Sequence, residues 1–366
     1  MTARHLYVHV PFCARRCVYC DFSIAVRRVT PVDEYLRALT QELDQRASAI
    51  GELDTIYLGG GTPSRLGGEG IVRVLDLIRK AVAVDAGAEI TIEANPDDVT
   101  APLATQWKSA GVNRISLGVQ SFDDTTLKWM HRVHDSASAQ NAFNTLRDAG
   151  FENISVDLIF ALPDSLSRSW ESDLDRAIEL NPDHISLYGL TIESATPLGR
   201  WSAAGSVFAA DEEKYAAEFL LADRAAVAAG FEHYEVSNFA KPGKNSRHNS
   251  AYWTGAQYVG LGPSAHSFDG NARSWNVAPY AEWVARLARD ESTVEDAEVL
   301  TESNRQAEKV YLGLRTRGGL SVTDTDRESA NLWSENGWAE IDGDVVRLTS
   351  EGWLRLDSLA AALTGF

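Results

Sequence analysis

Polar and apolar residues alternate in short segments along the first half of the chain, and longer stretches with helical spacing separate them. The alternating segments span residues 5–10, 55–58, 89–94, 114–119, 154–160 and 184–190. Apolar residues recur at helical spacing over residues 31–49, 68–84, 100–110, 136–149 and 167–180. Parallel strands need crossover connections, so this alternation predicts an α/β fold with a parallel sheet, as a partial or complete (β/α) barrel.

The last part of the chain has a different pattern. Helical spacing over 302–314 and 324–336 precedes a predicted hairpin over 338–348 and a final helix over 350–363. This order predicts a winged-helix-like module. Its many acidic residues argue against DNA binding, so we expect a packing or lid role. We therefore divide the chain into a core at 1–205, an extension at 206–298, whose pattern is the least clear, and a C-terminal module at 299–366.

Composition narrows the class of protein. The 366 residues are 44% hydrophobic, which suffices for a large core, and the formal charge of -18 weighs against binding nucleic acid. No uninterrupted apolar run of about 18 residues predicts a membrane-spanning segment. The start of the chain lacks the apolar stretch of a secretion signal. We therefore expect a cytoplasmic protein.

Polar residues or glycines stand at or near the ends of successive predicted strands. These are Gly61, Thr62, Glu93, Gln120, Asp157 and Glu193. In (β/α) barrels the carboxyl ends of the strands form one mouth, where catalytic residues gather. The recurrence therefore predicts a shared site, although each residue taken alone could equally cap a neighbouring helix or turn.

The chain has three cysteines, Cys13, Cys17 and Cys20, within one predicted loop. A 4Fe-4S cluster normally has four cysteine ligands, so this CxxxCxxC set predicts a cluster with one iron open to another ligand. An odd number of clustered thiols is a poor disulfide framework. The alternative is a Cys3His zinc site completed by His5 or His9, but both histidines fall within a predicted strand.

With the flanking run from Tyr7 to Cys13, this motif resembles the radical S-adenosylmethionine (SAM) superfamily, in its coproporphyrinogen-dehydrogenase-like branch. The resemblance covers nearly the whole chain. It implies a partial (β/α)6 TIM-like barrel, a 4Fe-4S cluster held by Cys13, Cys17 and Cys20, and SAM on the open iron. The positions that it assigns to SAM binding are Tyr7, Gly61, Thr62, Glu93, Gln120, Arg132 and Asp157. The glycines at 59–61 resemble the strand end that lets the backbone approach the methionine moiety.

Two features choose between members of this branch. The dehydrogenases that the chain resembles carry a fourth cysteine two residues after the third, where this chain has Phe22. Residues 248–253 resemble the HNxxYW motif of the HemW-type haem chaperones, which associates His248 with haem. His266 is a second candidate near the same region. The resemblance thus implies a haem chaperone with haem donor and acceptor proteins as partners. The alternatives are a coproporphyrinogen III dehydrogenase or another radical SAM enzyme acting on a tetrapyrrole, and an RNA-modifying enzyme, which the acidic charge disfavours.

Overall fold

The core of the protein is a strongly curved sheet with helices on its outer face. The computed structural model describes residues 2–365. Its central strands are β1 (Ala3–Val10), β4 (Ile50–Gly60), β5 (Val84–Ala94), β6 (Arg114–Gln120), β7 (Ile154–Phe160) and β8 (His184–Gly189). Each pairs in parallel with the next, which confirms the predicted partial (β/α)6 barrel.

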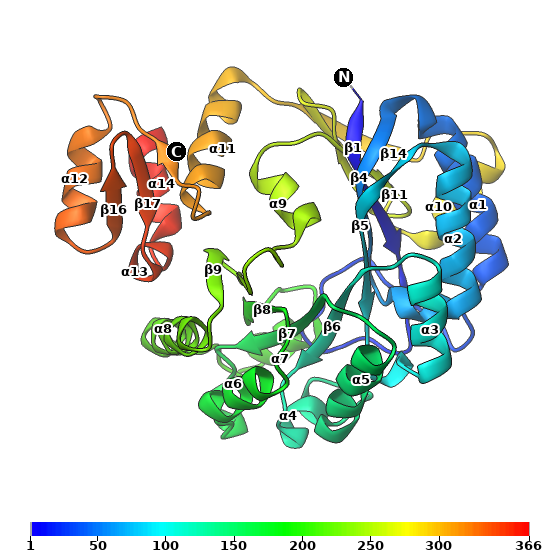
Figure 1. Cartoon of the computed structure of the whole chain (residues 1–366), viewed down its shortest axis with the longest axis horizontal. Helices are drawn as coiled ribbons and strands as arrows, with labels where there is room; N and C mark the ends of the chain where they lie inside the picture. The colour runs from blue at the N-terminus through cyan, green and yellow to red at the C-terminus, as the bar shows by residue number, and fades with distance from the viewer. Residues whose placement is uncertain (1, 366) are drawn as a thin grey trace.

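The predicted crossover helices are present on the outside of the curve (Figure 1). They are α1 (Val32–Arg46), α2 (Gly67–Ala81), α3 (Ala101–Ser109), α5 (Ser136–Asp148) and α6 (Trp170–Glu179). Several predicted bounds were wrong by a few residues: α2 ends at Ala81 because β5 begins at Val84, and α6 begins only at Trp170 because Ser169 caps it. Sequence analysis missed α4 (Asp124–Trp129), α7 (Pro197–Ala203) and α8 (Glu212–Ala228).

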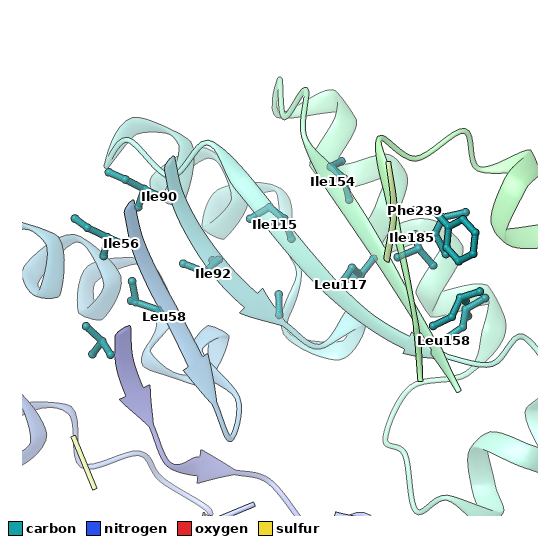
Figure 2. Packing of buried hydrophobic residues seen from close by; sticks show 14 of the residues in the cluster. Ile56, Leu58, Ile90, Ile92, Ile115, Leu117, Ile154, Leu158, Ile185 and Phe239 are labelled. Carbon is teal, nitrogen blue, oxygen red and sulfur yellow. The ribbon is translucent and has the colours of Figure 1, made fainter. Parts of the chain in front are cut away.

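The alternation in the strands separates two faces of the sheet. Figure 2 shows apolar side chains such as Ile56, Ile90 and Ile115, which are buried in the core that the sheet and the helices share. The alternate positions hold polar side chains such as Glu93, Ser116 and Asp157, which line a pocket inside the barrel. The interior of the barrel therefore holds a pocket into which the strands bring polar side chains, rather than a packed apolar core.

Residues 206–298 extend the same sheet at both edges. Beyond β8 come β10 (Asn238–Ala240) and β9 (Glu232–Glu235), and beyond β1 come β11 (Tyr258–Leu261), β12 (His266–Phe268), β13 (Ala272–Asn276) and β14 (Val294–Val299). The sheet therefore has twelve strands. Helix α10 (Tyr280–Ala288) packs on α1, and α9 (Arg247–Trp253) lies inside the curve of the sheet (Figure 1).

The C-terminal module contains the predicted helices and hairpin in order, but sequence analysis missed one short strand, and the helix predicted over 350–363 is broken into two helices. It comprises α11 (Glu302–Leu314), β15 (Leu320–Ser321), α12 (Arg327–Glu335), β16 (Ala339–Asp342), β17 (Val345–Leu348), α13 (Ser350–Trp353) and α14 (Leu356–Thr364). The three strands form a small sheet in the order β15-β17-β16. Residues 315–317, which follow α11, bond to residues 234–236 at the end of the edge strand β9, so the module covers that edge of the large sheet.

Candidate cofactor pocket

The three cysteines lie on a loop that is tied down at several points. Cys13 ends β2 (Phe12–Cys13), which pairs with β3 (Ala25–Val26) on the far side of the loop. Val18, between the other two cysteines, donates through its backbone N–H to Met130 O (3.3 Å) and accepts through its carbonyl from Leu198 N (2.9 Å). The loop is thus held from both sides before any ligand binds.

All three cysteines line one pocket of about 470 Å³ at the carboxyl ends of the barrel strands. Burial raises the pKa of the Cys20 thiol to about 11 and also raises the pKa of the Cys13 thiol. A bound metal cluster reverses this effect, because a coordinated thiol is deprotonated outright. The buried thiols therefore suit metal coordination better than free thiolate chemistry.

Most of the residues predicted to bind SAM meet in this pocket. Gly61, Thr62, Glu93, Gln120, Arg132 and Asp157 all line it, and so does Glu193. The expectation that polar strand-end residues converge on one mouth is confirmed.

Two predicted site residues do not line the pocket. The Tyr7 ring lies 6.2 Å from the Tyr57 ring, between centroids, and its hydroxyl bonds to His9 Nδ1 (3.1 Å), so it is the neighbouring Tyr57, not Tyr7, that lines the pocket. His248 is only 1% exposed on α9. The contacts predicted for Tyr7 with SAM and for His248 with haem stay predictions.

Glu93 and Asp157 are acidic residues that the barrel strands β5 and β7 place in the pocket. Glu93 accepts hydrogen bonds from the Tyr57 hydroxyl and from Gly60 N, both at 2.9 Å. Burial and, to a lesser extent, the charge of Asp157 raise the pKa of Glu93 to about 7. The two hydrogen bonds act in the opposite direction and lower this pKa. Burial also raises the pKa of Asp157, which accepts from Ser116 (2.8 Å) and Ser155 (2.9 Å). A cation entering the pocket would stabilise both carboxylates.

Arg132 is the cation beside the cysteines. It donates to Asn95 Oδ1 (2.6 Å), to Gly118 O (2.8 Å) and to Cys17 Sγ (3.6 Å), while its Nε is buried without a partner. Asn95 in turn donates to the Thr62 hydroxyl (3.2 Å), which bonds to Cys13 Sγ (3.4 Å). Arg132 thus keeps one donor for an anionic group in the pocket.

The glycines at 59–61 are required first by packing. A Cβ on Gly60, whose φ is +108°, would lie 2.5 Å from the His9 ring, and one on Gly61 would lie 2.7 Å from the Pro11 carbonyl. Side chains at these positions would push away the start of the cysteine loop. The triplet therefore brings the loop against the end of β4, a role that the interpretation based on ligand approach alone had missed.

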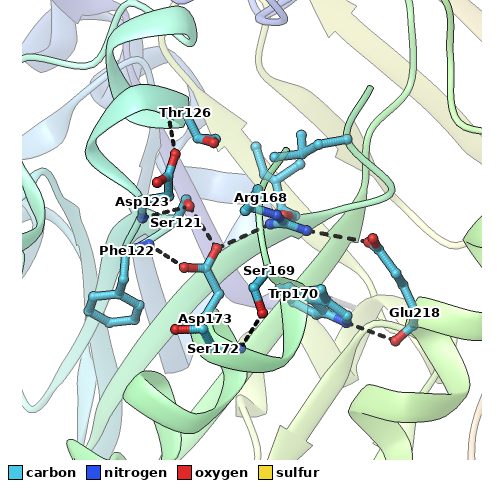
Figure 3. A network of polar contacts seen from close by, with 12 residues as sticks. Ser121, Phe122, Asp123, Thr126, Arg168, Ser169, Trp170, Ser172, Asp173 and Glu218 are labelled. Carbon is cyan, nitrogen blue, oxygen red and sulfur yellow. Dashed lines mark hydrogen bonds and ion pairs between the residues drawn. The ribbon is translucent and has the colours of Figure 1, made fainter. Parts of the chain in front are cut away.

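Gln120 has a strained backbone that a buried polar network supports. Its φ is +69°, and the register between β6 and β7 shifts beside it. Figure 3 shows the network: Asp173 accepts from the Ser121 hydroxyl (2.6 Å) and from Phe122 N (2.7 Å), and pairs with Arg168 (3.2 Å). Asp173, at the start of α6, thereby fixes the two residues that follow Gln120.

The zinc alternative does not fit this geometry. Both ring nitrogens of His9 are engaged, by the Tyr7 hydroxyl and by Ser23 O, and His5 bonds to the Thr55 hydroxyl. Neither histidine lines the pocket of the cysteines. Within residues 2–365, no three His, Cys, Asp or Glu side chains are gathered to hold a single metal ion. In a four-iron cluster each cysteine binds a different iron, so the cysteine sulfurs lie further apart than they would around a single metal ion.

Comparison with known proteins places this pocket in a family. Residues 7–177 match the family model described as "Radical SAM superfamily". The Mycobacterium tuberculosis "Heme chaperone HemW" is 36% identical over 369 residues, which cover 98% of this chain and 94% of that protein. The chain belongs to the HemW family of the radical SAM superfamily. The Bacillus subtilis HemW is 37% identical over 86% of this chain and 84% of its own length.

A solved structure supports the fold of this HemW-family chain. The "Coproporphyrinogen III oxidase (HemN)" from Escherichia coli aligns with a TM-score of 0.83 over 99% of this chain and 90% of its own, at 23% identity. Membership in the radical SAM superfamily implies a 4Fe-4S cluster and SAM. Three thiols, the carboxylates of Glu93 and Asp157 among others, and the unpartnered Arg132 Nε in one pocket fit these groups.

Several pocket residues were missed by sequence reasoning. They are Arg15, Tyr57, Asn95, Ser116 and Tyr188. Tyr57 and Ser116 could have been found by stepping back two or four residues from the predicted strand ends, because alternate side chains share a face of a strand.

Within residues 2–365 no helix has the length and apolar character needed to cross a membrane.

Proposed function

We propose that this protein is a haem chaperone, which binds haem and passes it to acceptor proteins. Its likeness to proteins named "Heme chaperone HemW" over 98% of its length carries the proposal. In this proposal a haem donor loads the chain, which works in the cytoplasm, where the thiols that hold its cluster stay reduced.

Cys13, Cys17 and Cys20 would hold the cluster and would leave one iron available for SAM. Glu93 accepts from the ammonium of SAM, and Arg132 donates its free Nε to the carboxylate. Gly61, Thr62, Gln120 and Asp157 shape the remaining wall, with Tyr7 acting through Tyr57. When bound, the reduced cluster supplies a single electron, and the residues described above position the ligand that receives it.

His248 is the proposed axial ligand to the haem iron. Its Nδ1 bonds to the Thr55 hydroxyl (2.7 Å) and its Nε2 to the Tyr252 hydroxyl (2.9 Å). Burial lowers the pKa of His248 to about 3, so its ring is neutral and has a lone pair to offer. When Nδ1 donates to Thr55, that lone pair is on Nε2, and iron binding requires the Tyr252 hydroxyl and the other side chains that bury His248 to move aside.

The alternative function is oxygen-independent coproporphyrinogen III dehydrogenation. The likeness to HemN favours it only at the level of fold, since the identity is 23%. Phe22 occupies the place of the fourth cysteine, and its side chain lines the pocket and is 58% exposed. A phenylalanine offers no sulfur ligand there, which favours a haem carrier over the oxidative decarboxylase.

Anaerobic turnover tests separate the two functions. The reconstituted protein is incubated with coproporphyrinogen III, SAM and a reductant, and carbon dioxide and protoporphyrinogen are measured. We expect no product above a control variant, Cys17→Ser, that lacks the cluster. Turnover above that control would contradict the chaperone function and support coproporphyrinogen III dehydrogenation.

A further inference from the structure

Two polar side chains on the inner face of the barrel have no hydrogen-bond partner. Arg114 is 1% exposed, and its Nε and Nη1 are buried without a partner. Thr91 is fully buried, and its hydroxyl is likewise unpartnered. The two residues are register partners on β6 and β5, so their side chains are neighbours on the same face. They form a continuous patch of free donors.

The charge of Arg114 is not neutralised by a neighbouring acid. Among residues 2–365 no carboxylate comes within 4.0 Å of its guanidinium nitrogens. Burial is the largest single effect and opposes the charge, but Glu89, Tyr57, Tyr234 and Asp157 together outweigh it, so the pKa of Arg114 lies above its usual value. The Glu89 oxygens already accept from Arg247 N (3.0 Å) and His248 N (2.9 Å).

A buried guanidinium without an ion partner is costly to the fold. Groups of this kind call for a functional explanation, because nearly all buried polar groups in proteins are satisfied. Asp157, the other acid nearby, is occupied by the hydroxyls of Ser116 and Ser155. The patch therefore suits an anion that comes from outside the chain.

The patch lies between the cofactor pocket and helix α9. Ser116, two residues after Arg114 on the same face of β6, lines the pocket. Tyr57, the register partner of Thr91 on β4, lines the pocket and also stacks on His248, with ring centroids 5.1 Å apart. Glu89, two residues before Thr91 on the same face of β5, accepts from His248 N (2.9 Å), so the patch and His248 lie on the same inner side of the sheet.

We propose that Arg114 and Thr91 bind one propionate carboxylate of the haem whose iron His248 holds. This inference rests on the proposed function. The two propionates are the charged substituents of haem, and a guanidinium fork with an adjacent hydroxyl matches a carboxylate. The site thus selects porphyrins that carry a free carboxylate at the edge inserted into the barrel.

The test compares haem with haem dimethyl ester, which keeps the ring and iron but has no carboxylate charge. Absorption titrations of both ligands are made on the reconstituted wild-type protein, Arg114→Gln, Arg114→Lys and Thr91→Val. Arg289→Gln, which changes an exposed arginine on the surface, is the control. We expect the wild type and the control to prefer haem by about tenfold or more, since a charge-assisted contact has about this strength.

In Arg114→Gln the ratio of the affinity for haem to the affinity for its dimethyl ester should fall close to one. In Thr91→Val this ratio should fall by about threefold. Arg114→Lys keeps the charge without the fork and should be intermediate. Circular dichroism shows which variants fold, and if Arg114→Gln does not, the other two decide. Haem binding with the same preference in all folded variants would overturn this inference and leave the proposed function standing. Failure of the wild type to bind haem would remove both.

Discussion

Glu93 gives the metal-free protein a predictable dependence on pH. Burial raises its pKa to about 7 in the folded state, against about 4.5 when unfolded. Between these values the folded protein binds the extra proton, so the free energy of unfolding falls as pH rises through this window. Because Glu93 is partly exposed to the pocket, we expect the free energy of unfolding to fall by about 2 kcal/mol across this pH range.

Urea unfolding of Glu93→Gln at pH 5 and pH 8 measures this effect. The variant should lose about 2 kcal/mol less than the wild type between the two pH values. The exposed Glu340→Gln should keep the full wild-type dependence. An unchanged slope in Glu93→Gln would mean that the carboxylate is ionised across the whole range.

Tyr252 controls access to His248. Because its hydroxyl bonds to Nε2 at 2.9 Å, Tyr252→Phe frees that nitrogen while keeping the ring. If His248 is the axial ligand, stopped-flow absorption should show faster haem association in Tyr252→Phe, and His248→Ala should lose the ligand-field spectrum of imidazole. Unchanged haem spectra in His248→Ala would assign the iron to another residue, with His266, which is exposed, the next to test.

At the scale of residues, the sequence predicted side chains better than their partners. Glu93, Gln120 and Asp157 were identifiable because polar residues at strand ends share one mouth. Asn95 was not, because its role depends on Arg132, 37 residues away, which no local pattern reveals. The hydrogen-bond partner of His248 was not identifiable for the same reason, since Thr55 is 193 residues distant.

At the scale of elements, Asp173 fixes helix α6 to the end of β6. It is 2% exposed and pairs with Arg168, whose side chain is 3% exposed. Asp173→Asn breaks a buried ion pair and should lower the free energy of unfolding by about 3 kcal/mol. Chemical denaturation measures this. The exposed Asp175→Asn on the same helix should change stability by less than about 0.5 kcal/mol.

The elements that the sequence predicted are those with a clear period. Strand β7 was predicted with its observed bounds, 154–160, and α11 with 302–314. Between 206 and 298 the pattern was unreadable because the strands there are short: β10 and β12 have three residues each. They are defined by pairing with distant strands, which local alternation cannot show.

On the scale of the whole molecule, the C-terminal module protects an exposed edge of the sheet. Arg315 pairs with Glu235 at 3.1 Å, and Trp353 donates to Leu314 O (3.0 Å) while its ring lies 4.3 Å from that of His233. At the opposite edge, β14 carries Glu295, Asp296 and Glu298, charges that discourage pairing with another chain. One edge of the sheet is therefore covered by the C-terminal module, and the other is protected by acidic side chains.

Trp353 should contribute to the stability of the entire chain. It is 5% exposed, and Trp353→Ala should lower the free energy of unfolding by about 3 to 5 kcal/mol and promote aggregation by loosening the cover of β9. Scanning calorimetry with light scattering measures both effects. Leu332→Ala, at a side chain that is 55% exposed on α12, serves as the control. Equal stability of the two variants would show that the module unfolds independently of the sheet.

The central claim is that this chain carries haem, and a haem titration of the reconstituted protein with SAM tests it most directly. Difference absorption in the Soret region is followed under anaerobic conditions. The account predicts a spectral change that saturates at one haem per chain. The bound haem should stay on the protein when it is diluted into buffer without an acceptor, and it should transfer to an added apoprotein that binds haem. A titration that rises without saturation, as free haem does, would contradict it.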